Sequence, residues 1–199
     1  MPVQIGAKAH SFSDPTGLLS DCHRRIEMFL GSLQRVAEVI DRPLTKEARS
    51  ALESALRYFR EMAPKHTADE EESLFPRLRQ IQDPEIENAL ASLDALEADH
   101  HKANTLHGEV DILGTRSLDE CCLPATEAAQ FRHAVNKLAS IYGEHIRIED
   151  EVVFPAAKRR LSSPNNRQLR MKWRAVATCA HSPPSLLVPS ACLIPSPLW

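Results

Sequence analysis

The sequence predicts an all-α protein, an up-down-up-down four-helix bundle followed by a short C-terminal helix and an irregular Pro-rich tail. Six glycines and 5% aromatic residues in 199 favour helices over sheets, as do long stretches of Ala, Leu, Glu and Arg. Apolar residues recur every three or four positions in four long segments, the pattern of amphipathic helices. The connections are short, which suits antiparallel neighbours in a bundle.

The first two helices are separated by a clear break. Apolar residues follow a helical stripe over residues 16–40, and Asp41-Arg42-Pro43 interrupts it. A second stripe starts at about residue 45 and continues to residue 70. Because proline lacks a backbone N–H and clashes with the preceding turn, we expect Pro64 to kink this second helix.

The last two helices are delimited by proline and glycine. Asp83 followed by Pro84 is a good start for the third helix, and Gly114 is its expected stop. A polar, Cys-bearing connection, residues 115–125, leads to the fourth helix, whose apolar stripe continues to Val152.

The chain has the length of one domain with an appendage. We expect the bundle to occupy residues 14–161 and a short helix to occupy residues 162–178. An irregular tail should follow over residues 179–199, where five prolines are spread through a stretch without charged side chains from His181 onward.

Charge and composition exclude several classes of protein. The net charge of −3 gives no general attraction to nucleic acid or to anionic membranes. The first residues lack the apolar core of a signal peptide, and no run of about 18 apolar residues could span a membrane. We therefore expect a cytoplasmic protein without a nucleic-acid or membrane partner. The five cysteines include no CxxC pair, so no thiolate zinc site is indicated.

One motif occurs twice. The stretch HTADEEESLFPRL begins at His66, and HIRIEDEVVFPAAKRRL begins at His145. In each copy a Glu follows the His by four residues, Glu70 and Glu149, so that both side chains lie on one helix face. Each copy then continues to Phe-Pro. This spacing is that of metal ligands, and two copies indicate a paired site.

Each copy also has a histidine upstream on another predicted helix. Residue counts from the shared loops place all four histidines near one level of the bundle. Four imidazoles and two carboxylates are too polar to share a core layer unless something binds them. The sequence predicts a binuclear metal centre, and its donors suit iron or manganese, with zinc possible. The predicted ligands are His23, His66, Glu70, His100, His145 and Glu149.

Other polar residues near the motifs have alternative interpretations. A lone histidine on an apolar helix face is more often a satisfied core residue than a ligand. His100 lies on the apolar stripe, whereas His101 lies about 100° around the helix. His107, two turns beyond His100, is too far to share its metal ion and is expected beside the site or on the surface. Glu71 is expected to face solvent unless Pro64 twists the helix.

These motifs resemble the hemerythrin-like family, the HHE cation-binding domain. The resemblance covers residues 14–161 and is carried by CHRRIE, HTADEEESLFP, ADHHKA and HIRIEDEVVFP. It implies a non-haem di-iron centre, bridged by Glu70 and Glu149, that binds O2 reversibly or reports on oxygen, iron or nitric oxide. Oxygen-carrying hemerythrins have His-x-x-x-His on the third helix, whereas Asn104 follows His100 here. One imidazole fewer weakens stable O2 carriage.

Three functions remain open at this point. The first is a protein with two iron ions (Fe2+/Fe3+) that binds or senses O2 or another small diatomic. The second is an iron-dependent oxidase, peroxidase or nitric-oxide handling enzyme, in which the missing imidazole leaves room for water or peroxide. The third is a bundle with a structural or zinc-filled site. Because no catalytic acid or base and no substrate or organic-cofactor site is visible, the sequence favours a metal-binding protein over an enzyme.

Overall fold

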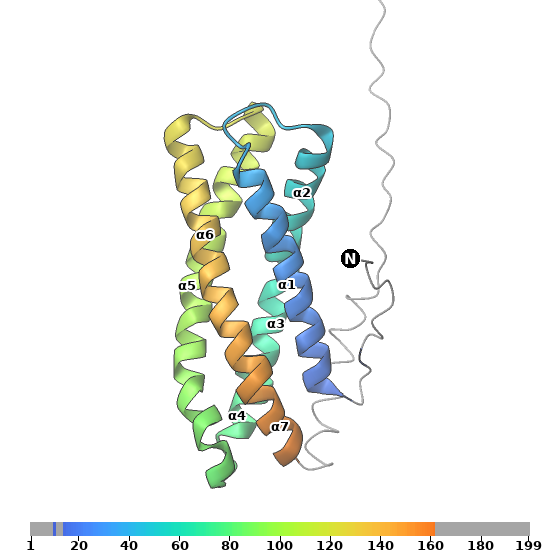
Figure 1. Ribbon diagram of the computed structural model, residues 1–199, viewed down its shortest axis with the longest axis vertical. Helices are drawn as coiled ribbons and strands as arrows, with labels where there is room; N and C mark the ends of the chain where they lie inside the picture. Colours follow the sequence, from blue (N-terminus) through green and yellow to red (C-terminus); the bar gives the residue numbers. More distant parts are fainter. Residues whose placement is uncertain (1–9, 11–13, 162–199) are drawn as a thin grey trace, which may run out of the picture.

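The computed structural model describes residue 10 and residues 14–161, which form four helical rods (Figure 1). The first rod is α1, Pro15–Ala37. The second comprises α2, Lys46–Glu61, α3, Ala63–Asp69, the π-helix η1, Glu70–Leu74, and α4, Phe75–Leu78. The third is α5, Glu87–Glu120, preceded by the 3-10 turn η2, Pro84–Ile86. The fourth comprises α6, Ala125–Ile148, the π-helix η3, Glu149–Val153, and α7, Phe154–Arg160.

The rods run alternately up and down, as Figure 1 shows, so the predicted all-α bundle is confirmed. The α1–α2 and α5–α6 connections meet at one end, where Leu123 donates its N–H to the carbonyl of Ile40 at 2.9 Å. Asp14 accepts the N–H of Gly17 at the start of α1, and Thr45 accepts that of Ala48 at the start of α2. These side-chain caps satisfy backbone donors that have no partner within the helix.

Two apolar clusters fill the bundle above and below a polar layer. One lies toward the α1–α2 connection and includes Ile26, Leu33 and Phe131. The other lies toward the opposite end and includes Leu19 and Phe75. The polar layer thus has a dry core on both sides, with Leu19 and Ile26 one helical turn either side of His23.

The third rod is longer than the sequence indicates. The expected stop at Gly114 is wrong, because α5 continues to Glu120. Gly114 is buried against α2, where a Cβ atom would lie 3.0 Å from both terminal methyl carbons of Leu56. The glycine therefore permits close helix packing. The helix ends instead at Cys121, whose φ of 72° lies outside the helical region.

The second rod bends near the position that the sequence indicates. The break falls at Met62, and Pro64 lies in the first turn of α3, where its missing N–H costs no helical hydrogen bond. The predicted short helix, residues 162–178, and tail, residues 179–199, lie outside the described residues. Within the part of the chain that the structure describes, no helix is long and apolar enough to cross a membrane.

Candidate metal centre

The two copies of the motif adopt the same local structure. His66 lies in α3 and His145 in α6, and each ligand-type glutamate, Glu70 or Glu149, begins a π-helix. The amide after each π-helix, that of Phe75 or Phe154, donates back five residues to the glutamate carbonyl. Prolines follow these phenylalanines. Because a proline cannot continue the regular ladder, a π turn accommodates it without ending the rod.

The six predicted residues are brought together in one buried layer. His23 comes from α1 and His100 from α5, opposite the two motif helices. The four histidines are 1–8% exposed, and both glutamates are fully buried. Charged or polar side chains are buried to this extent only when they are paired or bind an ion.

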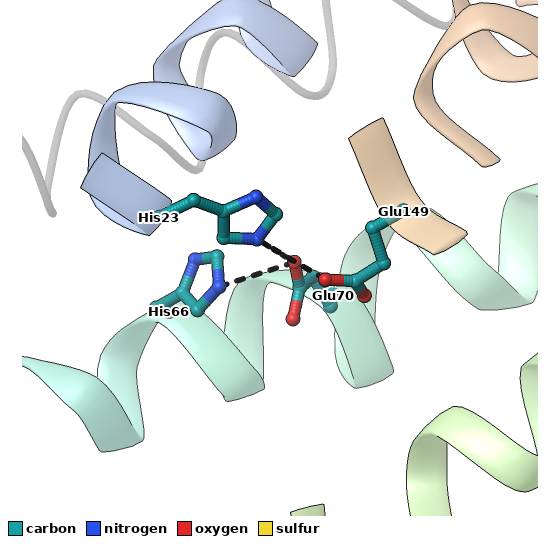
Figure 2. A group of neighbouring side chains, drawn as sticks. All are labelled: His23, His66, Glu70 and Glu149. Carbon is teal, nitrogen blue, oxygen red and sulfur yellow. Dashed lines mark ion pairs between the residues drawn. The ribbon is translucent and has the colours of Figure 1, made fainter. Parts of the chain in front are cut away.

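One half of the layer contains His23 and His66 with both glutamates (Figure 2). The Nε2 atom of His23 lies 3.1 Å from Oε2 of Glu149 and 3.8 Å from Oε1 of Glu70. The Nε2 atom of His66 lies 3.3 Å from the same Oε1 of Glu70. Potential ligand atoms of these four residues all lie within 4.8 Å of one another.

The other half contains His100 and His145 with the same two glutamates. Nε2 of His100 lies 3.4 Å from Oε2 of Glu70, and Nε2 of His145 lies 3.1 Å from Oε2 of Glu149. These four residues also place ligand atoms within 4.8 Å of one another. Since both carboxylates belong to both groups, the layer has the arrangement of a binuclear site with two shared carboxylates.

The carboxylates are suited to cations. All four oxygens of Glu70 and Glu149 are buried and have no hydrogen-bond partner among the described residues. A buried acceptor without a donor costs about 1–3 kcal/mol, and more when it is charged. Cations between the two carboxylates would satisfy these oxygens, and neutral imidazole Nε2 atoms would complete the donor set. The residues present therefore fit a pair of metal ions.

The histidines differ in their protonation equilibria. Burial lowers the pKa of His66 to about 4. Burial acts in the same direction on His23, but the contact with Asp150 and the nearby carboxylates of Glu149 and Glu70 outweigh it and raise the pKa to about 12. Burial also opposes the charged form of His100, yet Glu70 and Glu71 raise its pKa to about 9. For Glu70, burial is outweighed by His66, His100 and His23, which lower its pKa. Both upward shifts favour the protonated forms of His23 and His100 in the metal-free layer.

Two further acids orient the histidines from α1 and α5. Nδ1 of His23 lies 3.2 Å from Oδ1 of Asp150, which also accepts a 2.6 Å hydrogen bond from Ser20. Nδ1 of His100 lies 2.8 Å from Oε1 of Glu71. An acid on Nδ1 holds an imidazole with Nε2 toward a metal.

This arrangement repeats with the motif, because each acid directly follows a shared glutamate on a π-helix. The expectation that Glu71 faces solvent is wrong, and the alternative that it reaches the site is what the structure shows. The expectation assumed a regular helix, on which Glu71 would lie about 140° from His66. The π turn at Glu70 changes that angle and brings the carboxylate to His100. Asp150 and Ser20 were not predicted. The acid after each glutamate in both copies is the sequence feature that could have indicated Asp150.

The remaining histidines near the layer lie outside both ligand groups. His101 is exposed, which agrees with the choice of His100. His107 is half-buried, and its Nε2 lies 3.0 Å from the hydroxyl of Tyr142. Its ring stacks on Phe59 at a centroid distance of 4.4 Å. Tyr142 in turn lies against the ring of His145.

A helical bundle that buries four imidazoles and two shared carboxylates at one level belongs to the metal-binding class of four-helix proteins. Comparison with known proteins identifies the family of this chain. The model of the hemerythrin HHE cation binding domain matches residues 14–157, and the chain belongs to this family. An uncharacterized protein of Haemophilus influenzae strain Rd is 26% identical over 154 residues, which cover 77% of this chain and 84% of that protein.

Proposed function

We propose that the protein is a non-haem di-iron protein that binds or senses O2 or a related diatomic. The observation that carries this proposal is the pair of four-residue groups that share Glu70 and Glu149. Two shared carboxylates can hold two cations side by side, and two imidazoles per group leave coordination positions open for a small ligand. Family membership supports cation binding in this layer.

The donor set is compatible with iron, and the proposed ligand chemistry selects iron among the candidate metals. Imidazole nitrogen and carboxylate oxygen suit iron, manganese and zinc, whereas copper(I) and iron–sulfur clusters prefer thiolates. No cysteine belongs to either ligand group of the described residues. Zinc has no redox chemistry, whereas iron combines reversible electron transfer with binding of diatomic molecules, so we assign iron.

The chain's own residues supply the rest of the site. The apolar clusters above and below the layer exclude water from those two sides, as Leu74 and Ile26, 1% and 0% exposed, illustrate. Asp150 and Glu71 keep the Nε2 atoms of His23 and His100 turned toward the shared carboxylates. A rigid, preoriented donor set reduces the reorganisation that metal binding requires.

Asn104 favours redox turnover as a second candidate function. It stands four residues after His100, is exposed, and lines a recess that also includes His100. We expect an O2 adduct of the reduced iron protein to form and then decay to the ferric state. Stopped-flow absorption measures this decay, and Asn104→His should lengthen the adduct's life. An adduct of the unsubstituted protein that stays stable and reversible for hours would contradict the reasoning.

The metal content of two variants tests the proposed centre. Glu70→Ala and Glu149→Ala should each lower the iron count from about two per chain toward one or none, because both ions share each carboxylate. Glu72→Ala and His101→Ala alter exposed neighbours and should retain both ions. Full iron content in either glutamate variant would refute the assignment of the shared carboxylates.

An absorption spectrum separates the three functions. The iron-loaded protein is recorded under air, after anaerobic reduction, and again with O2. Bands of an oxo-bridged ferric pair that bleach and return with O2 support binding or sensing. Bands that return only as a second substrate is consumed support an enzyme. A colourless protein that retains zinc in preference to iron would refute the di-iron proposal.

A further inference from the structure

A recess between α3 and α5 leads from solvent to one half of the candidate centre. It encloses about 230 Å3 and is open on one side. The α3–α5 recess, as we call it, is lined on one side by Ala63, Pro64 and Thr67 and on the other by His100 and Asn104. A second hollow adjoins it along α2 and shares Phe59, Pro64, Asn104 and His107.

The recess reaches the layer at His100, the one candidate ligand among its described lining residues. His100 is 8% exposed, against 6% for His66 and 1% for His23. Asn104 lies one helical turn from His100 and also lines the recess. A larger side chain at position 104 would occupy part of this space, whereas the asparagine leaves it open.

The lining of the recess is mixed: apolar residues such as Phe59 and Ala103 lie beside polar ones, among them the acidic Glu71. Tyr142, 8% exposed, lines the recess and lies between His107 and the candidate ligand His145. Its hydroxyl lies 3.0 Å from Nε2 of His107. Small-molecule sites combine apolar surface with polar groups that set the orientation of the ligand.

The tautomer of His107 determines whether the hydroxyl hydrogen of Tyr142 is available to another acceptor. Nδ1 of His107 is buried and has no hydrogen-bond partner among the described residues. A proton on Nδ1 would therefore be a buried, unpaired donor, so the proton belongs on Nε2, which then donates to the phenol oxygen. A tyrosine hydroxyl has an ordinary pKa of about 10, so it keeps its proton at pH 7. The phenol hydrogen is then free to point into the recess.

We propose that the α3–α5 recess is the access and binding pocket for a small neutral ligand of the dioxygen and nitric oxide class, which reaches the His100–His145 half of the centre and accepts a hydrogen bond from Tyr142. The proposal rests on the proposed function, because it requires metal in the layer. It adds which half of the centre meets the ligand and which side chains admit and hold it.

Nitric oxide binding to the reduced, iron-loaded full chain tests the pocket. Asn104→Trp should slow association about tenfold by filling the recess, with two irons per chain retained. Glu27→Trp is the matched control, because Glu27 is exposed and follows His23 by four residues as Asn104 follows His100. It should leave the rate unchanged. Thr67→Trp blocks the recess from the opposite wall and gives a second measurement if Asn104→Trp does not fold.

The hydrogen bond is tested separately. Tyr142→Phe should keep the iron count and association rate but speed dissociation of nitric oxide about two- to tenfold, the effect of losing one hydrogen bond. If Asn104→Trp and Thr67→Trp both bind two irons and keep the association rate of the unsubstituted protein, the pocket is overturned and access from the His23–His66 half is indicated. Unchanged dissociation in Tyr142→Phe would overturn the role of the phenol. Failure of the unsubstituted protein to bind iron would instead refute the proposed function.

Discussion

Removing the charge from the acids that orient His23 and His100 should weaken metal binding without removing a ligand. Asp150→Asn and Glu71→Gln are close in shape to the native residues and keep an oxygen that can accept the Nδ1 hydrogen bond. The native contacts are 3.2 Å for His23 with Asp150 and 2.8 Å for His100 with Glu71. Asp150 and Glu71 are 36% and 30% exposed, so solvent partly screens their charge.

The expected magnitude follows from this geometry. Loss of an outer acid bonded to a ligand imidazole lowers metal affinity by about 10- to 100-fold, or about 1.4–2.7 kcal/mol. Because Asn and Gln keep the hydrogen bond, we place the single variants near the lower limit, at about tenfold. Asp150→Leu and Glu71→Leu, which remove the bond entirely, should approach about a hundredfold. Asp150 and Glu71 contact different histidines, but both histidines lie against the same two carboxylates. The effects of the two substitutions on metal affinity therefore need not be additive.

Iron(II) affinity is measured by anaerobic competition with a chromophoric chelator. Glu72→Gln and Glu151→Gln are matched controls, since both residues are exposed and adjoin the altered acids. A spectroscopic measurement adds specificity: in the metal-free protein, Glu71→Gln should lower the pKa of His100, because the Glu71 contact helps to raise it. NMR titration of His100 detects this shift.

Two results would refute the reasoning. If Asp150→Asn and Glu71→Gln bind iron as tightly as Glu72→Gln and Glu151→Gln, the acids do not orient the ligands. If affinity falls but the pKa of His100 in Glu71→Gln is unchanged, the loss comes from general damage to the π-helix.

Three further predictions concern pH, helix stability and chain length. Metal-free protein should lose stability as pH rises above about 6.5, because the raised pKa values of His100 and His23 mean that the folded state holds protons that the unfolded chain releases. The His100 part of this loss should be complete near pH 9, the His23 part should continue above it, and unfolding measured at each pH will show both. Iron affinity should rise over the same range, since metal displaces these protons. Gly143→Ala should raise the free energy of unfolding by about 0.5–1 kcal/mol, because the site is exposed and a Cβ there meets nothing within 4 Å. Gly114→Ala should raise it by less, because Leu56 crowds the added Cβ. Truncation after Thr178 should leave helicity and iron content unchanged, because all six candidate ligands lie in the described bundle; loss of iron would show that the bundle needs the removed residues.

The fold and the convergence of six side chains could be predicted because both depend on local geometry. A period of 3.6 residues makes the apolar stripe visible, and a spacing of four puts His66 beside Glu70 whatever surrounds them. The all-α bundle is confirmed, and the structure brings the six predicted side chains into one layer. Because the connections are short, consecutive helices were expected to be antiparallel neighbours. Residue counts from each connection then gave the level of each histidine in the bundle.

Features that depend on neighbouring helices could not be predicted in this way. Gly114 resembles a helix end in the sequence, but its role is to let α5 approach Leu56 of α2. The contact between His107 and Tyr142 joins residues 35 apart on two helices, so no local pattern indicates it. The same holds for the recess, which opens where α3 and α5 separate.

The sequence alone thus determined which residue types face the centre, because side-chain direction on a helix is set by the residue's position in the turn. Only the tertiary structure decided what supports them. The π turns at Glu70 and Glu149 alter the helical period, which makes Glu71 and Asp150 face His100 and His23 on other rods. A π turn rotates the side chains that follow it by a fraction of a helical turn. Which residue they then contact depends on the neighbouring helix, so only the tertiary structure shows it.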